Sequence, residues 1–458
     1  MVTKMEDRIK VDLATMSKMI LDELRLCRPD SLSSTPDTIK RIGTQFNQGS
    51  LLQYHYGEIE KAEILCRGEI ELFAQLSSHP THKALCLAYM VQPYINLARI
   101  YGQKGEVRES LSIFEDIYRF GLQQKDLYIF GHHLSVTDAP AMFVAAPGYQ
   151  RGMLACRVID ATRVLQTIDD YPALLALVET NAGLPEYNDM FFKQFLGEVR
   201  TRALLNLGQY ALAAEALEEC CRQMRSNAPD RIVIQSLLSQ IYRQWGRDDL
   251  ARVTLNKLEE HLARGEKFGG KLPILRQIAY RLALERYAMG DESKALATAE
   301  KAFKLSQEWN DQSGSVKSAI LLLRLCTNGT QGTYAPAMQR QWFEELQRLA
   351  SATLFRLERA CGYWELGFAC DVIESEGETI SEHAGDFLLK SYNLYRSIPF
   401  VDSKQSCEAV KRSLDSWERR FPARSPLGNE VRSSDSSSIE SVFDALMEHV
   451  PKSFVASQ

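Results

Sequence analysis

Two segments of equal length decide the fold: LSQIYRQWGRDDLARVTLNKL at residues 238–258 and LALERYAMGDESKALATAEKA at residues 282–302. Both segments have the same pattern of apolar, small and turn-forming residues at offsets 1, 4, 8, 13, 17 and 20 from the first leucine. Spacings of three and four residues place side chains on one face of a helix. The shared glycines, Gly246 and Gly290, are typical of the residue that ends a helix. The pattern therefore predicts a helical hairpin, present at least twice.

The same pattern recurs earlier in the chain. It starts at Leu97, with a turn at Gly105, and weaker copies turn at Gly57, Asp169 and Gly208. Small residues recur where the two helices of a hairpin would cross, which allows their axes to approach closely. One hairpin cannot bury its apolar stripe alone, so neighbouring hairpins are expected to stack into a continuous core.

These hairpins resemble the tetratricopeptide repeat. The resemblance implies an all-α fold, a right-handed superhelical solenoid of antiparallel helix pairs with a concave face lined by the first helix of each pair. The expected turns lie 38 to 64 residues apart, whereas the repeat period of the family is roughly 34 residues. We therefore expect degenerate repeats with long helices or variable linkers.

Composition limits the class of protein. The 458 residues are 45% hydrophobic and 25% charged, as in an ordinary globular chain, and the net charge of −5 argues against nucleic-acid binding. The ten cysteines are scattered without a Cys-x-x-Cys pair, which favours a reducing compartment. The N-terminus does not read as a signal peptide, and no apolar run is long enough to span a membrane. We expect a cytoplasmic protein.

Four regions are expected along the chain. Residues 1–36 form an N-terminal capping helix and a loop, and residues 37–310 hold the repeats, interrupted by an irregular insertion at about 121–150. Divergent helical pairs follow at 311–420, and 421–458 is a mostly disordered tail. Within the tail, SIESVFDALMEHV predicts a short amphipathic helix that either docks back on the solenoid or binds a partner.

The resemblance also implies which residues face the concave groove. The position two residues after the repeat's signature residue is Arg99, Arg163, Arg202, Gln240 and Leu284. Neighbouring groove candidates are Asn96, Asn206, Arg243, Tyr280, Tyr287, Gln92, Gln166, Phe195, Ser236 and Gln277.

Arginines that line a groove favour carboxylates. The hypothesis is a non-enzymatic scaffold that binds a protein or peptide partner, acidic or carboxylate-bearing, as an adaptor or regulatory sensor. An alternative stays open: the arginines pair with acidic residues of the same chain, such as Asp160 and Glu198.

The insertion supports two further hypotheses. Its aromatic residues, Tyr128, Phe130, Phe143 and Tyr149, would form a ligand pocket against the groove, and His132 or His133 would serve an enzyme or enzyme accessory. His79 and His82 are spaced like metal ligands, but Pro80 between them favours a turn. No phosphate-binding loop, Gly-x-Ser-x-Gly element or Cys nucleophile context is present. We expect no catalytic residue, no metal and no cofactor.

Overall fold

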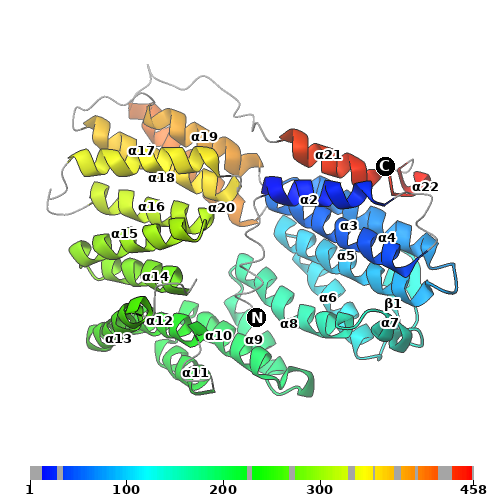
Figure 1. The fold of residues 1–458 in the computed structure, drawn as a ribbon. Helices are drawn as coiled ribbons and strands as arrows, with labels where there is room; N and C mark the ends of the chain where they lie inside the picture. Colours follow the sequence, from blue (N-terminus) through cyan, green and yellow to red (C-terminus); the bar gives the residue numbers. More distant parts are fainter. Residues whose placement is uncertain are drawn as a thin grey trace. The chain divides into compact units, whose positions relative to one another are not determined.

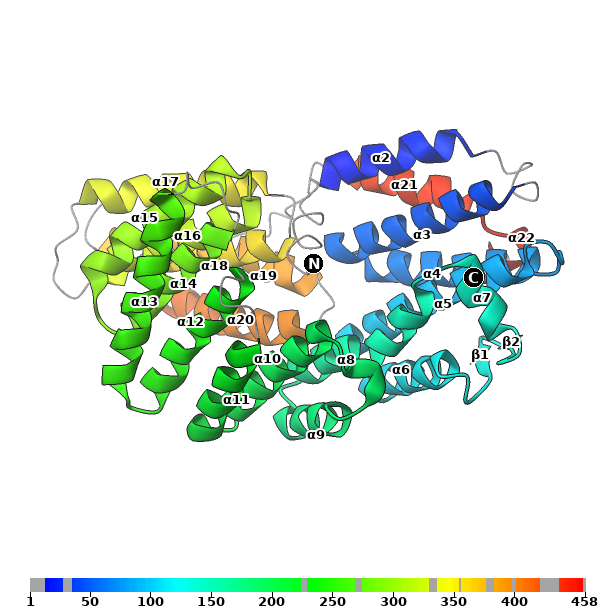
Figure 2. The same ribbon diagram turned by 60° about the horizontal axis from the view of Figure 1, so that its bottom comes forward.

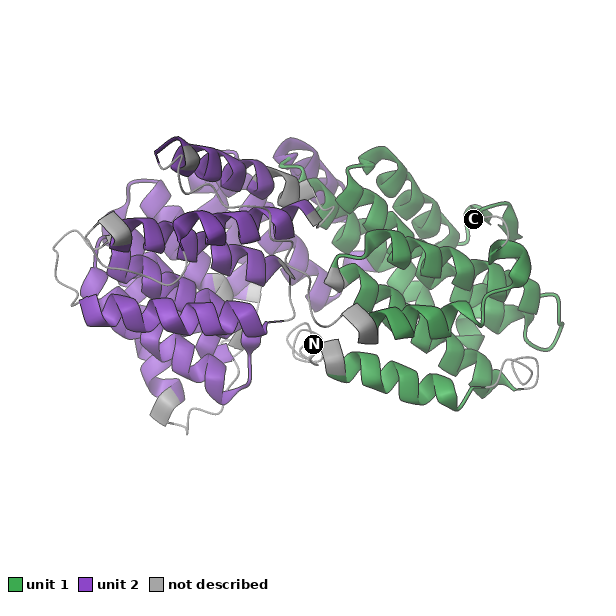
Figure 3. Cartoon of the chain, turned by 90° about the horizontal axis from the view of Figure 1, so that it is seen from above, with its two compact units in different colours: residues 1–169, 397–404, 432–458 green, residues 170–396, 405–431 purple. Residues whose placement is uncertain are grey.

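The computed structural model describes residues 13–27, 35–223, 229–267, 274–328, 336–353, 356–375, 383–397, 401–420 and 436–455. The chain forms two compact units (Figure 3). Unit 1 comprises residues 1–169, 397–404 and 432–458, and unit 2 comprises residues 170–396 and 405–431. The predicted all-α class is confirmed, because helices pack in consecutive pairs in both units (Figure 1).

The elements of unit 1 are α2 (Leu13–Arg25), α3 (Pro36–Tyr56), α4 (Ile59–Leu76), α5 (Lys83–Lys104), α6 (Val107–Gly121), β1 (Leu127–Ile129), β2 (His132–Leu134), α7 (Ala139–Ala145), α8 (Tyr149–Thr167), α21 (Ser436–Met447) and α22 (Lys452–Val455). Helices α2 to α6 pack each on the next, and α6 then packs on α8. The alternate helices also contact in turn, α3 with α5 and α5 with α8. The first helices of the hairpins therefore form a layer of their own.

Unit 2 repeats this arrangement. Its elements are α9 (Tyr171–Asn181), the 3-10 helix η2 (Pro185–Tyr187), α10 (Met190–Asn206), α11 (Tyr210–Gln223), α12 (Pro229–Gln244), α13 (Asp248–Lys267), α14 (Ile274–Ala288), α15 (Glu292–Glu308), α16 (Gln312–Asn328), α17 (Pro336–Ala352), α18 (Arg356–Ser375), α19 (Ala384–Ser397) and most of α20 (Val401–Arg420). The alternate helices α12, α14, α16 and α18 contact one another in turn.

The predicted turns are confirmed by the backbone. The residues at all six expected turn positions have positive φ: Gly57, Gly105, Asp169, Gly208, Gly246 and Gly290. A left-handed residue after the last helical turn lets its N–H bond a free carbonyl, as Gly105 does with Gly102. Asp169 takes this conformation without being glycine, which aspartate tolerates better than most residues.

Small side chains lie where the two helices of a hairpin cross. Ala251, Ala283 and Ala295 are completely buried, so the helix axes approach closely without a void between them. At the equivalent place in unit 1, the Ser110 hydroxyl donates a hydrogen bond of 2.6 Å to the Ala98 carbonyl. At this crossing the buried hydroxyl is therefore paired as well as closely packed.

The insertion at 121–150 is more regular than a loop. Strands β1 and β2 pair antiparallel through a two-residue turn at Phe130 and Gly131, both with positive φ. Helix α7 follows and packs on α5. The sequence predicted an irregular segment here; the β-hairpin is the part that this prediction missed.

The C-terminal amphipathic helix docks back on unit 1. α21 packs against α2, α3 and α4, and Figure 2 shows it beside α2 and α3. Val442 and Leu446 are completely buried, and the Gln53 amide donates a 3.0 Å hydrogen bond to the Ile439 carbonyl. The docking alternative is therefore the one observed. The expected disorder at 421–435 lies outside the described residues.

Candidate functional site

In unit 1, the predicted groove residue Arg99 is held by an acidic neighbour. Its Nε and Nη2 donate to the two carboxylate oxygens of Asp160 at 3.0 and 2.9 Å, and Nη1 donates to the Asn96 side-chain oxygen at 2.8 Å. The Asn96 amide in turn donates to Asn47 at 2.8 Å. Burial lowers the pKa of Arg99, but the Asp160 carboxylate outweighs it and the net pKa is raised. This network joins α3, α5 and α8.

Arg163 shares the same carboxylate but only loosely. Its Nη1 lies 3.8 Å from Asp160 Oδ1, and its side chain is 64% exposed. Its guanidinium therefore keeps most of its hydrogen-bonding capacity for solvent or a partner.

In unit 2, Arg–Glu pairs lie within and between the first helices. Arg202 pairs with Glu198 on α10 at 2.8 Å. Arg243 on α12 pairs with Glu285 on α14 at 3.2 Å, and Arg324 on α16 pairs with Glu365 on α18 at 2.6 Å. We call this surface, carried by α10, α12, α14, α16 and α18, the first-helix face of unit 2. The internal salt bridges that the sequence left as an alternative are confirmed for Arg99 with Asp160 and for Arg202 with Glu198.

Arg281 is the exception on this face, and the sequence did not single it out. Its half-buried side chain forms no hydrogen bond or ion pair within the described part of the chain. Burial lowers the pKa of Arg281 and the charge of Arg202 lowers it further, against smaller effects of Glu198, Tyr280 and Glu285. Two guanidinium groups thus share one region in which the nearest glutamates already have partners.

The remaining predicted residues of this face are in different environments. Gln240 is half-buried, whereas Asn206 is exposed and donates to the Arg202 carbonyl at 2.8 Å. Tyr280 and Tyr287 pack on the core of unit 2, and burial raises the pKa of Tyr280. Both phenols also act on the charge of Arg324, so they lie near the Arg324–Glu365 pair.

The histidines of the insertion each pair with a different carboxylate. His132 Nε2 lies 3.2 Å from Glu71, and His133 Nε2 lies 2.9 Å from Asp126. His79 and His82 stack with their ring centroids 5.3 Å apart. Across the described ranges, no three His, Cys, Asp or Glu side chains are placed to hold a metal ion.

The aromatic residues proposed for an insertion pocket contact separate neighbours. Tyr128 stacks on His133, and Phe130 lies under the Arg67 guanidinium at 4.4 Å. The Tyr149 ring meets Tyr89 edge to face. The contacts of Phe130 and Tyr149 hold the insertion against α4 and α5, and the ligand pocket stays a prediction.

Comparison with known proteins finds similarity in structure but not in sequence. No protein-family model matches the chain, and no curated protein matches it in sequence. Yeast Tom70 has a TM-score of 0.37 at 11% identity, over 89% of this chain and 97% of Tom70. A signal transduction ATPase from Pyrococcus horikoshii that has a tetratricopeptide repeat sensor has a TM-score of 0.37 at 14% identity, over 88% of this chain and 55% of the ATPase. BtubC from P. vanneervenii has a TM-score of 0.35 at 16% identity, over 58% of this chain and 96% of BtubC.

At TM-scores this low, the structures do not superpose over their whole length. The tetratricopeptide-like character of the fold therefore rests on the chain's own hairpins, with their left-handed turns and small crossing residues. No helix in the described part of the chain is both long enough and apolar enough to cross a membrane.

Proposed function

We propose that this chain is a non-enzymatic interaction scaffold that binds an acidic or carboxylate-bearing segment of a partner protein on the first-helix face of unit 2. It would act as an adaptor or a regulatory sensor. The observation that supports this best is Arg281, a half-buried cation without a partner in the described residues, on a face where other arginines are neutralised.

The physical argument concerns desolvation. A partly buried guanidinium beside a second one loses hydration and is repelled by its neighbour. A carboxylate supplied by a partner would restore the lost interactions through paired, charge-assisted hydrogen bonds. Arg243 and Arg324 already have carboxylate partners within the chain. Their salt bridges would hold together the helices that carry Arg281.

The residues around Arg281 would complete the contact. In unit 2, they are the predicted residues Arg202, Asn206, Gln240, Arg243, Tyr280 and Tyr287. Unit 1 is considered by itself: there Arg163 offers an exposed guanidinium of its own, while Asn96 and Arg99 would position Asp160 and the helices around it. Tyrosine and arginine are the side chains most often dominant in protein interfaces.

A peptide array tests this proposal. Immobilised peptides graded from neutral to strongly acidic would be probed with the intact protein, and the tightest acidic peptide would be carried into fluorescence anisotropy. Arg281→Gln is expected to weaken this binding by roughly 10- to 100-fold, the range for a lost hydrogen bond to a charged group. Arg202→Ala is expected to weaken it as well.

The matched control is Arg340→Gln, since Arg340 forms an exposed pair with Glu344 on α17, away from the first-helix face. Its affinity should equal that of the wild type. Equal binding of neutral and acidic peptides, or unchanged affinity in Arg281→Gln, would show that the proposal is wrong.

A further inference from the structure

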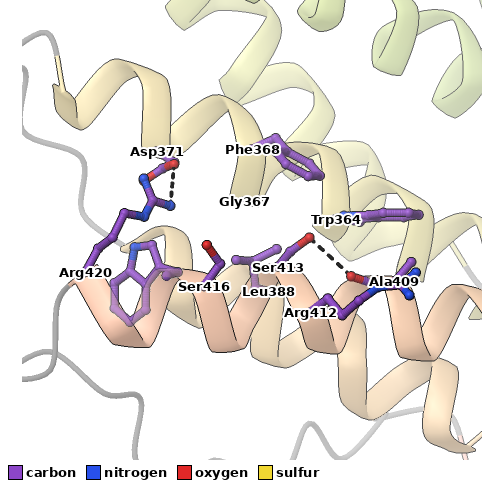
Figure 4. Close-up of a pocket in the computed structure, with 11 residues that line it drawn as sticks. Trp364, Gly367, Phe368, Asp371, Leu388, Ala409, Arg412, Ser413, Ser416 and Arg420 are labelled. Atoms are coloured by element: carbon purple, nitrogen blue, oxygen red, sulfur yellow. Dashed lines mark hydrogen bonds and ion pairs between the residues drawn. The ribbon is translucent and has the colours of Figure 1, made fainter.

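A second binding feature lies in unit 2 among α18, α19 and α20 (Figure 4). It is an open trough with a volume of about 360 Å³, within the lower range of ligand sites in proteins. Trp364, Gly367, Phe368 and Asp371 line it from α18, Leu388 from α19, and Ala409, Arg412, Ser413, Ser416, Trp417 and Arg420 from α20.

Helix periodicity explains why these residues meet. The α18 residues are spaced by three, one and three positions, which places them on one stripe of the helix. The α20 residues follow the same rule over three turns. Two stripes on neighbouring helices face each other, and Leu388 lies between them (Figure 4). The described residues that line the trough therefore all lie on helices, two facing stripes from α18 and α20 and Leu388 from α19.

The floor of the trough is closely packed. Trp417 is 1% exposed and Leu388 is 4% exposed. Gly367 lets the Leu388 side chain approach α18, because a Cβ at this position would lie 2.8 Å from Leu388 Cγ and Cδ2. An apolar group that enters the trough would thus meet a surface that is already packed, which lowers the ordering cost of binding.

One wall carries an exposed aromatic ring. The side chain of Phe368 is 48% exposed, and its ring centroid lies 6.1 Å from that of Trp364. A large apolar side chain of a ligand would cover Phe368 and Trp364 together and remove apolar surface from water.

The two ends of the trough differ in charge balance. At one end, Arg420 is neutralised by Asp371 at 2.8 Å. Toward the other, Arg412 is exposed and forms no hydrogen bond or ion pair with any described residue. The Ser413 hydroxyl donates to the Ala409 carbonyl at 3.2 Å, so its proton is already used within α20. The ligand chemistry that complements this end is anionic.

We propose that the trough is a docking site for an acidic peptide segment of a partner protein, with one large apolar side chain seated on Phe368 and Trp364 and a carboxylate paired with Arg412. The combination of an aromatic surface with an adjacent arginine is typical of the few residues that dominate a protein interface. The site is separate from Arg281 and does not depend on the function proposed for the first-helix face.

The test uses an array of short peptides in which Leu, Phe or Trp is paired with Asp or Glu at every spacing from one to four residues. Matched peptides replace the acidic residue by Lys, or the apolar residue by Ala. The wild-type protein is expected to prefer peptides with both groups. Phe368→Ala and Arg412→Ala are each expected to weaken binding of the best peptide by about tenfold or more.

Matched controls come from the same two helices. Leu357→Ala removes another exposed apolar side chain of α18, and Lys411→Ala removes the neighbouring charge on α20; neither residue lines the trough. Both controls, and Arg281→Gln, should bind this peptide as the wild type does. This outcome distinguishes the trough from the first-helix face, because binding at each site is then weakened only by substitutions at that site.

Three results would overturn the proposal. One is equal or tighter binding of the Lys peptides. Another is unchanged affinity in both Phe368→Ala and Arg412→Ala. The third is self-association measured by analytical ultracentrifugation that Phe368→Ala abolishes, because a second copy of this chain would then be the occupant of the trough.

Discussion

At the scale of single residues, the carboxyl group of Glu69 is buried in unit 1 at a cost in free energy. It lies on α4 with 0% exposure, and neither carboxyl oxygen has a hydrogen-bond partner among the described residues. Burial raises the pKa of Glu69 well above its usual value. The group is therefore neutral in the folded protein, since an unpaired buried carboxylate would cost far more.

This neutral acid makes stability depend on pH. The folded pKa lies above the unfolded one, so folding retains a proton that the unfolded carboxyl releases. The stabilisation is complete below the unfolded pKa and falls by about 1.4 kcal/mol per pH unit until the pH passes the folded pKa. Glu69→Gln should therefore be more stable than the wild type at pH 7, with the difference shrinking toward pH 4.5.

Urea denaturation at a series of pH values measures this effect. Glu344→Gln serves as the control, because Glu344 is an exposed residue in a surface pair on α17. Parallel stability curves for wild type and Glu69→Gln across this pH range would contradict the prediction.

The candidate site was only partly predictable at this scale. The pairing of Arg99 with Asp160 and of Arg202 with Glu198 was one of the two alternatives read from the sequence. Arg281 was not, because what distinguishes it is the lack of a partner. That property depends on which side chains of α10 come close to α14, and local spacing carries no such information.

At the scale of elements, the hairpins were predictable because their determinants are local. A glycine at the end of a helix and small residues at fixed offsets act within one hairpin. The β-hairpin was missed because Phe130 has φ 47° in its turn, where asparagine or glycine is the usual signal. The trough was missed because its two stripes lie on α18 and α20, and neither stripe reveals which helix it faces.

The docking of the C-terminal segment predicts how a substitution at Gly68 on α4 affects stability. A Cβ at Gly68 would lie 2.8 Å from Val450 Cγ2, and valine cannot easily rotate away. Gly68→Ala should therefore destabilise unit 1 by about 1–3 kcal/mol, the usual cost of overpacking. Thermal or urea unfolding would measure it.

The matched substitution is Gly152→Ala on α8, also in unit 1. No atom lies within 4 Å of a Cβ at this exposed helical position. The gain in helix propensity should stabilise the protein by roughly 0.5–1 kcal/mol. Effects of the same sign in the two variants would show that Val450 does not limit the space above Gly68.

At the scale of the whole molecule, unit 1 is built from segments that are far apart in sequence. Residues 432–458 complete the unit that residues 1–169 begin, and unit 2 lies between them in the chain. The repeat pattern does not mark the division at Asp169 and Asp170, because the hairpin turn there resembles the others. The extent of the repeats over 37–310 stays a prediction.

Removal of residues 432–458 should therefore act on unit 1 alone. We expect faster hydrogen exchange of backbone amides in α2, α3 and α4, which lose their contacts with α21, and unchanged exchange in α14 to α16. A peptide of residues 436–455 added in trans should restore protection. Faster exchange in both units, or no change in either, would contradict this expectation.

The return of α21 to unit 1 also sets an order of events during translation. Residue 436 leaves the ribosome 267 residues after residue 169, which takes on the order of ten to fifty seconds at typical synthesis rates. Throughout this time the apolar surfaces of α3 and α4 that receive Val442, Leu446 and Val450 remain open to water. Until α21 and Val450 are synthesised, the nascent chain therefore exposes an apolar helical surface that is prone to association with other chains.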